Sequence, residues 1–260
     1  MDWLRRHGVG ARSAAEPHRE AAESADMGTP TPATFEAAAP YRRTAYLPSV
    51  VPGPLAADSG FGGQPYLAPG ITNPSCPRCD EPMPLIAQIA LDTLPAPVIA
   101  GTGLLQLFYC TRERDGNPCD VALEGWEAFS PCHVSRLVTA GPGGTSTVVD
   151  TPFESKRITG WTPADDYPNW EELGALGADT GEPPDDVEAF PLEGEKLGGW
   201  PAWVQGIEYP SCPQCDTQMA LVLQVDSEKQ VAMLWGDMGI GHVTQCPNHP
   251  EVLTFAWACT

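Results

Sequence analysis

The clearest pattern along the chain is an alternation of apolar and more polar positions in two short stretches. In residues 83–91 one face carries Met83, Leu85, Ala87, Ile89 and Leu91, and in residues 219–225 it carries Met219, Leu221, Leu223 and Val225. A period of two with one wholly apolar face is typical of a β-strand packed on a core. Apolar runs predict further strands at residues 103–110 and 240–246, and closing strands at 126–132 and 252–259.

These predicted strands belong to a segment that occurs twice. Residues 61–110 and 197–246 superimpose without a gap at an offset of 136 positions. The matched pairs include Gly62/Gly198, Gly63/Gly199, Pro65/Pro201, Ser75/Ser211, Cys76/Cys212, Cys79/Cys215, Met83/Met219, Gln88/Gln224 and Cys110/Cys246. An ungapped repeat of this length is typical of a duplicated structural unit. The adjacent glycines predict a tight turn in each copy, since glycine accepts backbone angles that other residues avoid.

The cysteines in each copy follow the spacing of a zinc site. A pair separated by two residues is followed, after thirty more, by a third cysteine. Four ligands arranged two and two suit a tetrahedral zinc ion. We therefore predict two structural zinc ions, one held by Cys76, Cys79, Cys110 and Cys119, the other by Cys212, Cys215, Cys246 and His249. Cys132 and Cys259 are predicted to be buried thiols, with Cys259 as the alternative to His249.

The predicted fold is mainly β or α+β, because 29 prolines and 26 glycines imply many turns and loops. It is an internal duplication of two zinc-ribbon-like β units, residues 59–140 and 197–260, packed as one globule. Residues 1–58 show no sustained period and predict a disordered N-terminal leader, in which Met27 is an alternative start. Residues 141–196 are predicted to connect the two units.

This connector is strongly acidic and carries half of the net charge of −20. It holds 13 Asp and Glu against 3 Lys and Arg, interspersed with Trp161, Tyr167, Trp170 and Phe190. Acidic groups among aromatic rings can bind a basic peptide; alternatively, the rings only pin the connector onto the units. The charge argues against nucleic acid and anionic membranes as partners. A basic protein or peptide is the expected partner, and solubility alone is the alternative explanation.

Two further features bear on compartment and packing. The first residues lack the apolar core of a signal peptide, and no run of about 20 apolar residues is present to cross a membrane. We expect a cytoplasmic protein, in which paired cysteines bind metal more often than they form disulfides. Gln88 and Gln224 interrupt apolar strands at matched positions, so we expect buried amides bonded to backbone groups near the double-glycine turns.

The strings KLGGWPAWVQ, SCPQCDTQMALVLQVD and QCPNHP resemble the YwqG-like family of bacterial proteins, which is largely uncharacterised. The order of double glycine, cysteine knuckle, strand with glutamine and later cysteine is more distantly similar to the programmed cell death protein 2 family of eukaryotes. The resemblance covers about residues 60–260 and is tighter in the second copy, where Trp200 and Trp203 replace Gln64 and Leu67. The eukaryotic relatives are associated with escorting a newly made, basic ribosomal protein, so the resemblance implies a basic client; that family's other zinc module is not visible in this sequence, and a ribosomal role is not carried over.

The leading hypothesis is a zinc-stabilised, non-enzymatic interaction or chaperone-like protein that binds a basic partner. Four protein ligands leave no open position on the metal, which argues against metal catalysis. One alternative is an enzyme of unknown class using the cleft between the two units. However, no serine elbow, phosphate loop or dinucleotide fingerprint occurs, and Cys132 and His133 would face opposite sides of a strand. The other alternative is a thiol redox protein, although such sites normally open a helix.

Overall fold

The computed structural model describes residues 37–141, 144, 149–178, 190–227 and 229–260. These residues form a mainly β structure, as predicted. Its strands are β1 (Arg43–Pro52), β2 (Gly60–Phe61), β3 (Leu85–Ala90), β4 (Leu104–Tyr109), β5 (Glu113–Arg114), β6 (Asn117–Pro118), β7 (His133–Val138), β8 (Lys156–Asp166), β9 (Lys196–Gly198), β10 (Ala220–Asp226), β11 (Ile240–Gln245) and β12 (Leu253–Ala258). The helices are η1 (Ala39–Tyr41), η2 (Leu91–Thr93), α2 (Cys119–Ala122) and α3 (Trp170–Ala175). Within the described part of the chain, no helix is long and apolar enough to cross a membrane.

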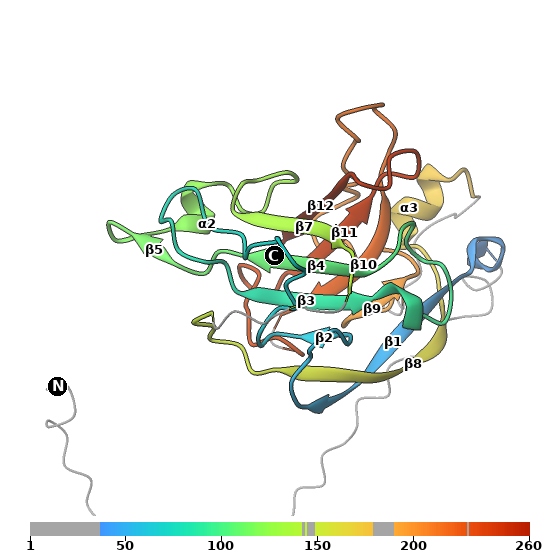
Figure 1. The fold of residues 1–260 in the computed structure, drawn as a ribbon. Helices are drawn as coiled ribbons and strands as arrows, with labels where there is room; N and C mark the ends of the chain where they lie inside the picture. The colour runs from blue at the N-terminus through green and yellow to red at the C-terminus, as the bar shows by residue number, and fades with distance from the viewer. Residues whose placement is uncertain (1–36, 142–143, 145–148, 179–189, 228) are drawn as a thin grey trace, which may run out of the picture.

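Ten of the strands form one antiparallel sheet in the order β12-β11-β10-β9-β1-β8-β2-β3-β4-β7. The order is symmetric about its centre. Strands β2, β3, β4 and β7 form a first half, strands β9 to β12 form a second half, and β1 and β8 lie between them. The sheet curls until its two end strands, β7 and β12, contact each other (Figure 1). The two halves therefore build a single structure.

The predicted strands in residues 83–91, 103–110, 219–225, 240–246 and 252–259 are confirmed as β3, β4, β10, β11 and β12. The alternating pattern underestimated their burial, because every residue of β3, β4 and β11 is buried. The closing strand expected at 126–132 is wrong. Phe129 there has a positive φ of 63°, Pro131 follows, and the strand β7 begins only at His133.

Part of the predicted leader is a strand in the middle of the sheet. Strand β1 pairs with β8 along its whole length but with β9 only at Ala45 and Tyr46. Pro48 and Pro52 therefore lie where one side of β1 has no neighbour, and the N–H group that proline lacks is not needed there. The prolines concealed the strand from pattern analysis. Residues 1–36 of the predicted leader lie outside the described residues.

The predicted acidic connector also contributes to the sheet, through β8 and the start of β9. Tyr167 and Phe190 pack edge to face, with ring centroids 4.7 Å apart, in a small cluster with Leu173. Tyr167 is almost fully buried. The alternative in which these rings pin the segment is therefore the one that the geometry favours. Its most acidic stretch, residues 179–189, lies outside the described residues.

Candidate metal centres

The structure brings the eight predicted ligands together in two groups. Within each group the ligand atoms lie within 4.8 Å of one another. The first group is Cys76, Cys79, Cys110 and Cys119, and the second is Cys212, Cys215, Cys246 and His249. Cys259 and Cys132 belong to neither group, so His249 completes the second set. None of the nine cysteines, all in the described residues, forms a disulfide.

The first two ligands of each group sit on a tight knuckle with the same backbone bonds in both halves. The Cys76 N–H donates to the Glu81 carbonyl at 3.0 Å, and the Cys212 N–H donates to the Thr217 carbonyl at 2.9 Å. The aspartate after each second cysteine has a positive φ, 63° at Asp80. Aspartate tolerates this conformation better than most residues, which lets both thiols point the same way.

The remaining ligands come from the ends of strands. Cys110 and Cys246 directly follow β4 and β11. Cys119 begins α2 after the β5–β6 hairpin, which returns the chain to the cluster, and its N–H donates to the Arg112 carbonyl at 2.8 Å. His249 lies three residues beyond Cys246 and offers its Nδ1 atom to the second cluster.

The distances between ligand atoms suit a tetrahedral metal ion. Cys79 and Cys110 sulfurs are 3.8 Å apart, Cys215 and Cys246 sulfurs 3.7 Å, and the Cys212 sulfur lies 3.7 Å from His249 Nδ1. A zinc ion with bonds of about 2.3 Å to sulfur separates tetrahedral ligands by roughly 3.7 Å. A disulfide would need about 2 Å between the sulfurs. The donor sets, four thiolates or three thiolates and an imidazole, are those that zinc takes in closed structural sites.

The surroundings shift the pKa values of the cluster thiols in both directions, lowering those of Cys79, Cys212 and Cys215 and raising those of Cys76, Cys110, Cys119 and Cys246. The pKa of Cys215 is lowered to about 6, first by a hydrogen bond with the Thr217 side chain. Burial raises the pKa of Cys119 to about 12, an effect that a bound cation would reverse. The pKa of His249 is raised chiefly by its hydrogen bond with Cys212.

Among the described residues, the first cluster has an arginine beside it and the second does not, which agrees with the difference in charge between their ligand sets. The Arg78 guanidinium donates to the Cys119 sulfur at 3.6 Å and to the carbonyls of Asn117 and Arg114. The residue 136 positions later is Gln214. Four thiolates around a divalent ion leave one more negative charge than three thiolates and a histidine, and the arginine stands beside the more negative set.

Gln88 and Gln224 are buried and fully hydrogen-bonded, as predicted. Gln88 donates to the carbonyls of Ala56 and Asp58 and accepts from the Tyr66 N–H. Gln224 makes the same three bonds with Leu192, Gly194 and Ala202, each 136 residues further on. The bonds hold the segments on either side of the double-glycine turn, not the turn itself.

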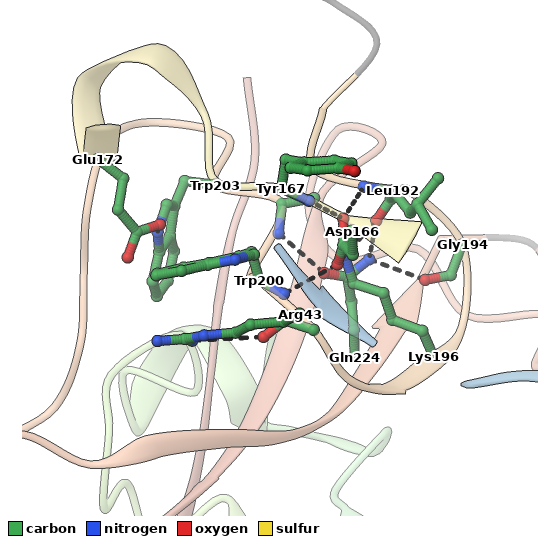
Figure 2. A network of polar contacts seen from close by, with 12 residues as sticks. Arg43, Asp166, Tyr167, Glu172, Leu192, Gly194, Lys196, Trp200, Trp203 and Gln224 are labelled. Carbon is green, nitrogen blue, oxygen red and sulfur yellow. Dashed lines mark hydrogen bonds and ion pairs between the residues drawn. The ribbon is translucent and has the colours of Figure 1, made fainter. Parts of the chain in front are cut away.

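A buried ion pair in the second half was not predicted. Lys196 and Asp166 have no exposed side-chain surface, and Lys196 Nζ donates to Asp166 Oδ2 at 2.8 Å. Asp166 also accepts from the backbone N–H groups of Tyr167, Leu192 and Trp200 (Figure 2). Burial lowers the pKa of Lys196, and the nearby carboxylate opposes that effect. At the matched position the first half has Gly60, against which Leu55 packs. The sequence signal for the ion pair was therefore the alignment of Lys196 with a glycine in the other copy of the repeat.

A groove of about 600 Å³ lies between the halves and was also not predicted in detail. It is lined by Trp126, Glu127, Ala128, Gln205, Glu208, Tyr209, Pro210, Ala256, Trp257, Ala258 and Cys259; we call it the tryptophan groove. A small cavity below it shares Glu208, Ala256 and Trp257 and reaches His242 and Thr244. Of the pockets in the described structure, the tryptophan groove corresponds best to the predicted cleft between the two units.

The cysteine and histidine considered for catalysis have separate partners. Cys132 donates to the Cys110 carbonyl at 3.8 Å, whereas His133 Nε2 lies 3.0 Å from the Glu127 carbonyl. Both side chains are buried. Neither contact forms the thiol–imidazole pair that nucleophilic catalysis requires.

A family model described as "Domain of unknown function (DUF1963)" matches residues 59–248. The match includes both cysteine knuckles and all but the last of the strands of the two halves. It leaves out β1. No curated protein matches the sequence.

Proposed function

The chain belongs to the DUF1963 family, whose domain has no assigned function, and from that premise we propose that it is a zinc-stabilised, non-enzymatic protein that binds a basic protein partner. The observation that carries the proposal is the pair of four-ligand clusters, each with all its ligands within 4.8 Å. Four protein ligands complete a tetrahedral shell, so zinc here would hold shape and leave no position for substrate.

The symmetry of the sheet supports a finer proposal about origin. Strands β4 and β11 lie 136 residues apart, and the glutamine bonds repeat at the same offset. We propose that the two halves are copies of one zinc-ribbon-like unit, and that the chain is related to the YwqG-like proteins. Free cysteines in both clusters fit a reducing compartment, and we propose the cytoplasm.

Metal analysis tests the zinc proposal. Protein purified without chelator should contain two zinc ions per chain, and Cys79→Ser or Cys215→Ser should each remove one. Cys132→Ser is the matched control, because Cys132 is buried outside both clusters. Each structural zinc contributes on the order of 10 kcal/mol of apparent folding free energy, so chelation should unfold the protein. Less than one zinc per chain in fresh protein would overturn the proposal.

A thiol redox function is the second candidate, since the Cys79 and Cys110 sulfurs approach to 3.8 Å. Thiol titration separates the two functions. Zinc-bound thiolates should react mainly after chelation, whereas redox thiols react equally before and after it.

Binding to basic partners is tested with protamine, an arginine-rich protein, at physiological salt. The zinc-loaded protein should bind it. Absence of binding by zinc-loaded protein would overturn the basic-partner proposal and leave the zinc proposal intact.

A further inference from the structure

The two halves differ at the position of Arg136, an arginine of the first half whose side chain is bound by other residues of the same half. Arg136 on β7 pairs across the sheet with Gln106 on β4, and its Nε donates to Gln106 Oε1 at 3.0 Å. Its Nη1 donates to the Thr72 carbonyl at 3.1 Å. The guanidinium also lies over the Phe108 ring, 4.9 Å from its centroid. The first half therefore fills this site with an arginine of its own, whose Nη2 is buried without a hydrogen-bond partner.

The second half lacks the arginine and has different side chains at the positions that surround it, with Thr244 in place of Phe108. The residue at the Gln106 position, 136 residues on, is His242, and its partner across the sheet on β12 is Ala256. The residue at the Thr72 position is Glu208. All four line the tryptophan groove or the small cavity below it. An alanine at the arginine position opens the space that the groove occupies.

The acceptor atoms in this space have no partner in the described structure. His242 Nε2 and Thr244 Oγ1 are buried and make no hydrogen bond, and the two residues are 5% and 1% exposed. Burial lowers the pKa of His242 to about 3, so the ring is neutral, and its Nε2 accepts a hydrogen bond when the ring proton is on Nδ1. A buried acceptor without a donor is costly, so these atoms point to a ligand that brings N–H groups.

The walls of the groove suit a flat cation. Trp126 and Trp257 stand nearly perpendicular, with ring centroids 6.4 Å apart, and the Trp257 N–H donates to the Trp126 carbonyl. Buried Glu172 accepts from Trp203 Nε1 and the Tyr209 hydroxyl, which fixes two further rings. The charged residues that line the groove are Glu127 and Glu208. Aromatic faces held in place beside carboxylates attract guanidinium groups at little ordering cost.

We propose that the tryptophan groove binds an arginine side chain of the basic partner, in the position that Arg136 occupies in the first half. This inference rests on the proposed function and names the site and the side chain through which the partner is bound. Arginine fits better than lysine, because its planar fork can donate to Glu208 and extend one N–H group into the cavity of about 10 Å³ at His242 and Thr244 while it stacks on a ring.

The decisive variant is Ala256→Arg, which supplies the second half with the arginine of the first. It should fill the site, raise the melting temperature by about 2–4 °C, and weaken binding of a short peptide with one central arginine by at least about tenfold. Ala256→Met fills similar space without a guanidinium, and should weaken binding without raising the melting temperature. If Ala256→Arg binds the peptide as the unchanged protein does, the inference is overturned.

The peptide and charge controls sharpen the result. A citrulline peptide keeps the shape but loses the charge, and should bind at least about tenfold more weakly; equal binding would overturn the inference. The double variant Glu127→Gln/Glu208→Gln should weaken arginine binding. The double variant Asp92→Asn/Glu113→Gln changes the net charge equally at exposed residues outside the groove, and should not. If a lysine peptide binds more tightly than the arginine peptide, the assignment of arginine is wrong.

Protamine separates this inference from the proposed function. If protamine binds the unchanged protein and Ala256→Arg equally, the groove is not the site, while binding to basic partners stands. If protamine binds neither, the proposed function fails as well. The ¹⁵N signal of His242 Nε2 should move when the arginine peptide binds, and a signal that stays in place would show that only a resident water occupies the cavity.

Discussion

Single residues account for much of the asymmetry between the two halves. The buried pair joins Lys196 of the second half to Asp166 of the central strand β8, whereas the first half has Gly60, in contact with Leu55, at the position of the lysine. Asp166, at the end of β8, accepts from the N–H groups of its neighbour Tyr167, of Leu192 before β9 and of Trp200 after β9, as well as from the lysine. A carboxylate with four donors is stable in the interior only while all four remain.

Removal of the lysine should therefore destabilise the protein strongly. Lys196→Met leaves the Asp166 carboxylate buried and short of its charged partner, and should lower the free energy of unfolding by about 3–5 kcal/mol. Arg42→Met breaks an ion pair with Asp165 whose side chains are 57% and 53% exposed, and should cost less than about 1 kcal/mol. Denaturant unfolding of the zinc-loaded variants measures both. Similar losses would show that the buried pair has no special role.

His242 should make stability depend on pH. Burial, together with Lys196, lowers its pKa to about 3 in the folded protein, against about 6.5 in an unfolded chain. Below pH 6.5 the unfolded chain takes up a proton that the folded protein does not, so stability falls as the pH decreases toward 3. Between pH 7 and 5.5 this loss is about 1 kcal/mol.

Comparison with His242→Gln isolates this effect. The raised pKa values of buried Glu172 and Glu195 act in the opposite direction, but both groups remain in the variant and cancel in the difference. Between pH 7 and 5.5 the free energy of unfolding should fall by about 1 kcal/mol less in the variant than in the unchanged protein. An equal fall in both proteins would mean that His242 is protonated in the folded protein.

At the scale of elements, the double-glycine turns place β2 and β9 against the central strands. Both Gly198 and Gly199 have positive φ, and a Cβ on Gly199 would lie 2.2 Å from Asp166 Oδ2 and 2.9 Å from Ala45 Cβ. The turn therefore needs glycine both for its backbone conformation and for its closeness to β1 and β8.

A pair of alanine variants separates these two requirements. Gly194 has a φ of +78°, but a Cβ there meets nothing within 4 Å, so Gly194→Ala should cost only the conformational strain of about 1–2 kcal/mol. Gly199→Ala adds the clash with Asp166 and should cost at least about 2 kcal/mol more. Thermal unfolding compares the two, and equal losses would contradict the crowding seen at Gly199.

The elements also show what sequence patterns can predict. The grouping of the eight candidate ligands was predictable because each knuckle and strand end is set by residues near in sequence, and the repeat supplied a second copy of the spacing. Strands β1 and β8 were missed because their pairing joins residues more than a hundred positions apart, as in Ala45 with Ala164. The arginine site was missed because its acceptor, Gln106, and its donor, Arg136, meet only when the sheet order is known.

At the scale of the whole molecule, each central strand of the sheet pairs with the half that does not directly follow it in the sequence. Strand β1 precedes the first half in the chain, yet in the sheet it lies next to β9 of the second; β8 precedes the second half, yet it lies next to β2 of the first. Neither half is then complete without a strand from the other side of the molecule. Cooperative folding of the full sheet should follow, because loss of either central strand exposes two unpaired edges.

Deletion of β1 tests this dependence, since the family match begins at residue 59 and does not include that strand. A protein of residues 37–260 should unfold in one cooperative transition, whereas residues 54–260 should lose the transition and aggregate despite keeping all eight metal ligands. A synthetic peptide of residues 37–53, added in excess, should restore the transition by pairing with β8 and β9, and a peptide with the same composition in scrambled order should not. Circular dichroism during heating and size-exclusion chromatography measure both effects. If residues 54–260 fold as stably as residues 37–260, β1 is dispensable, and the two halves are held together by β8 and the contact between β7 and β12 alone.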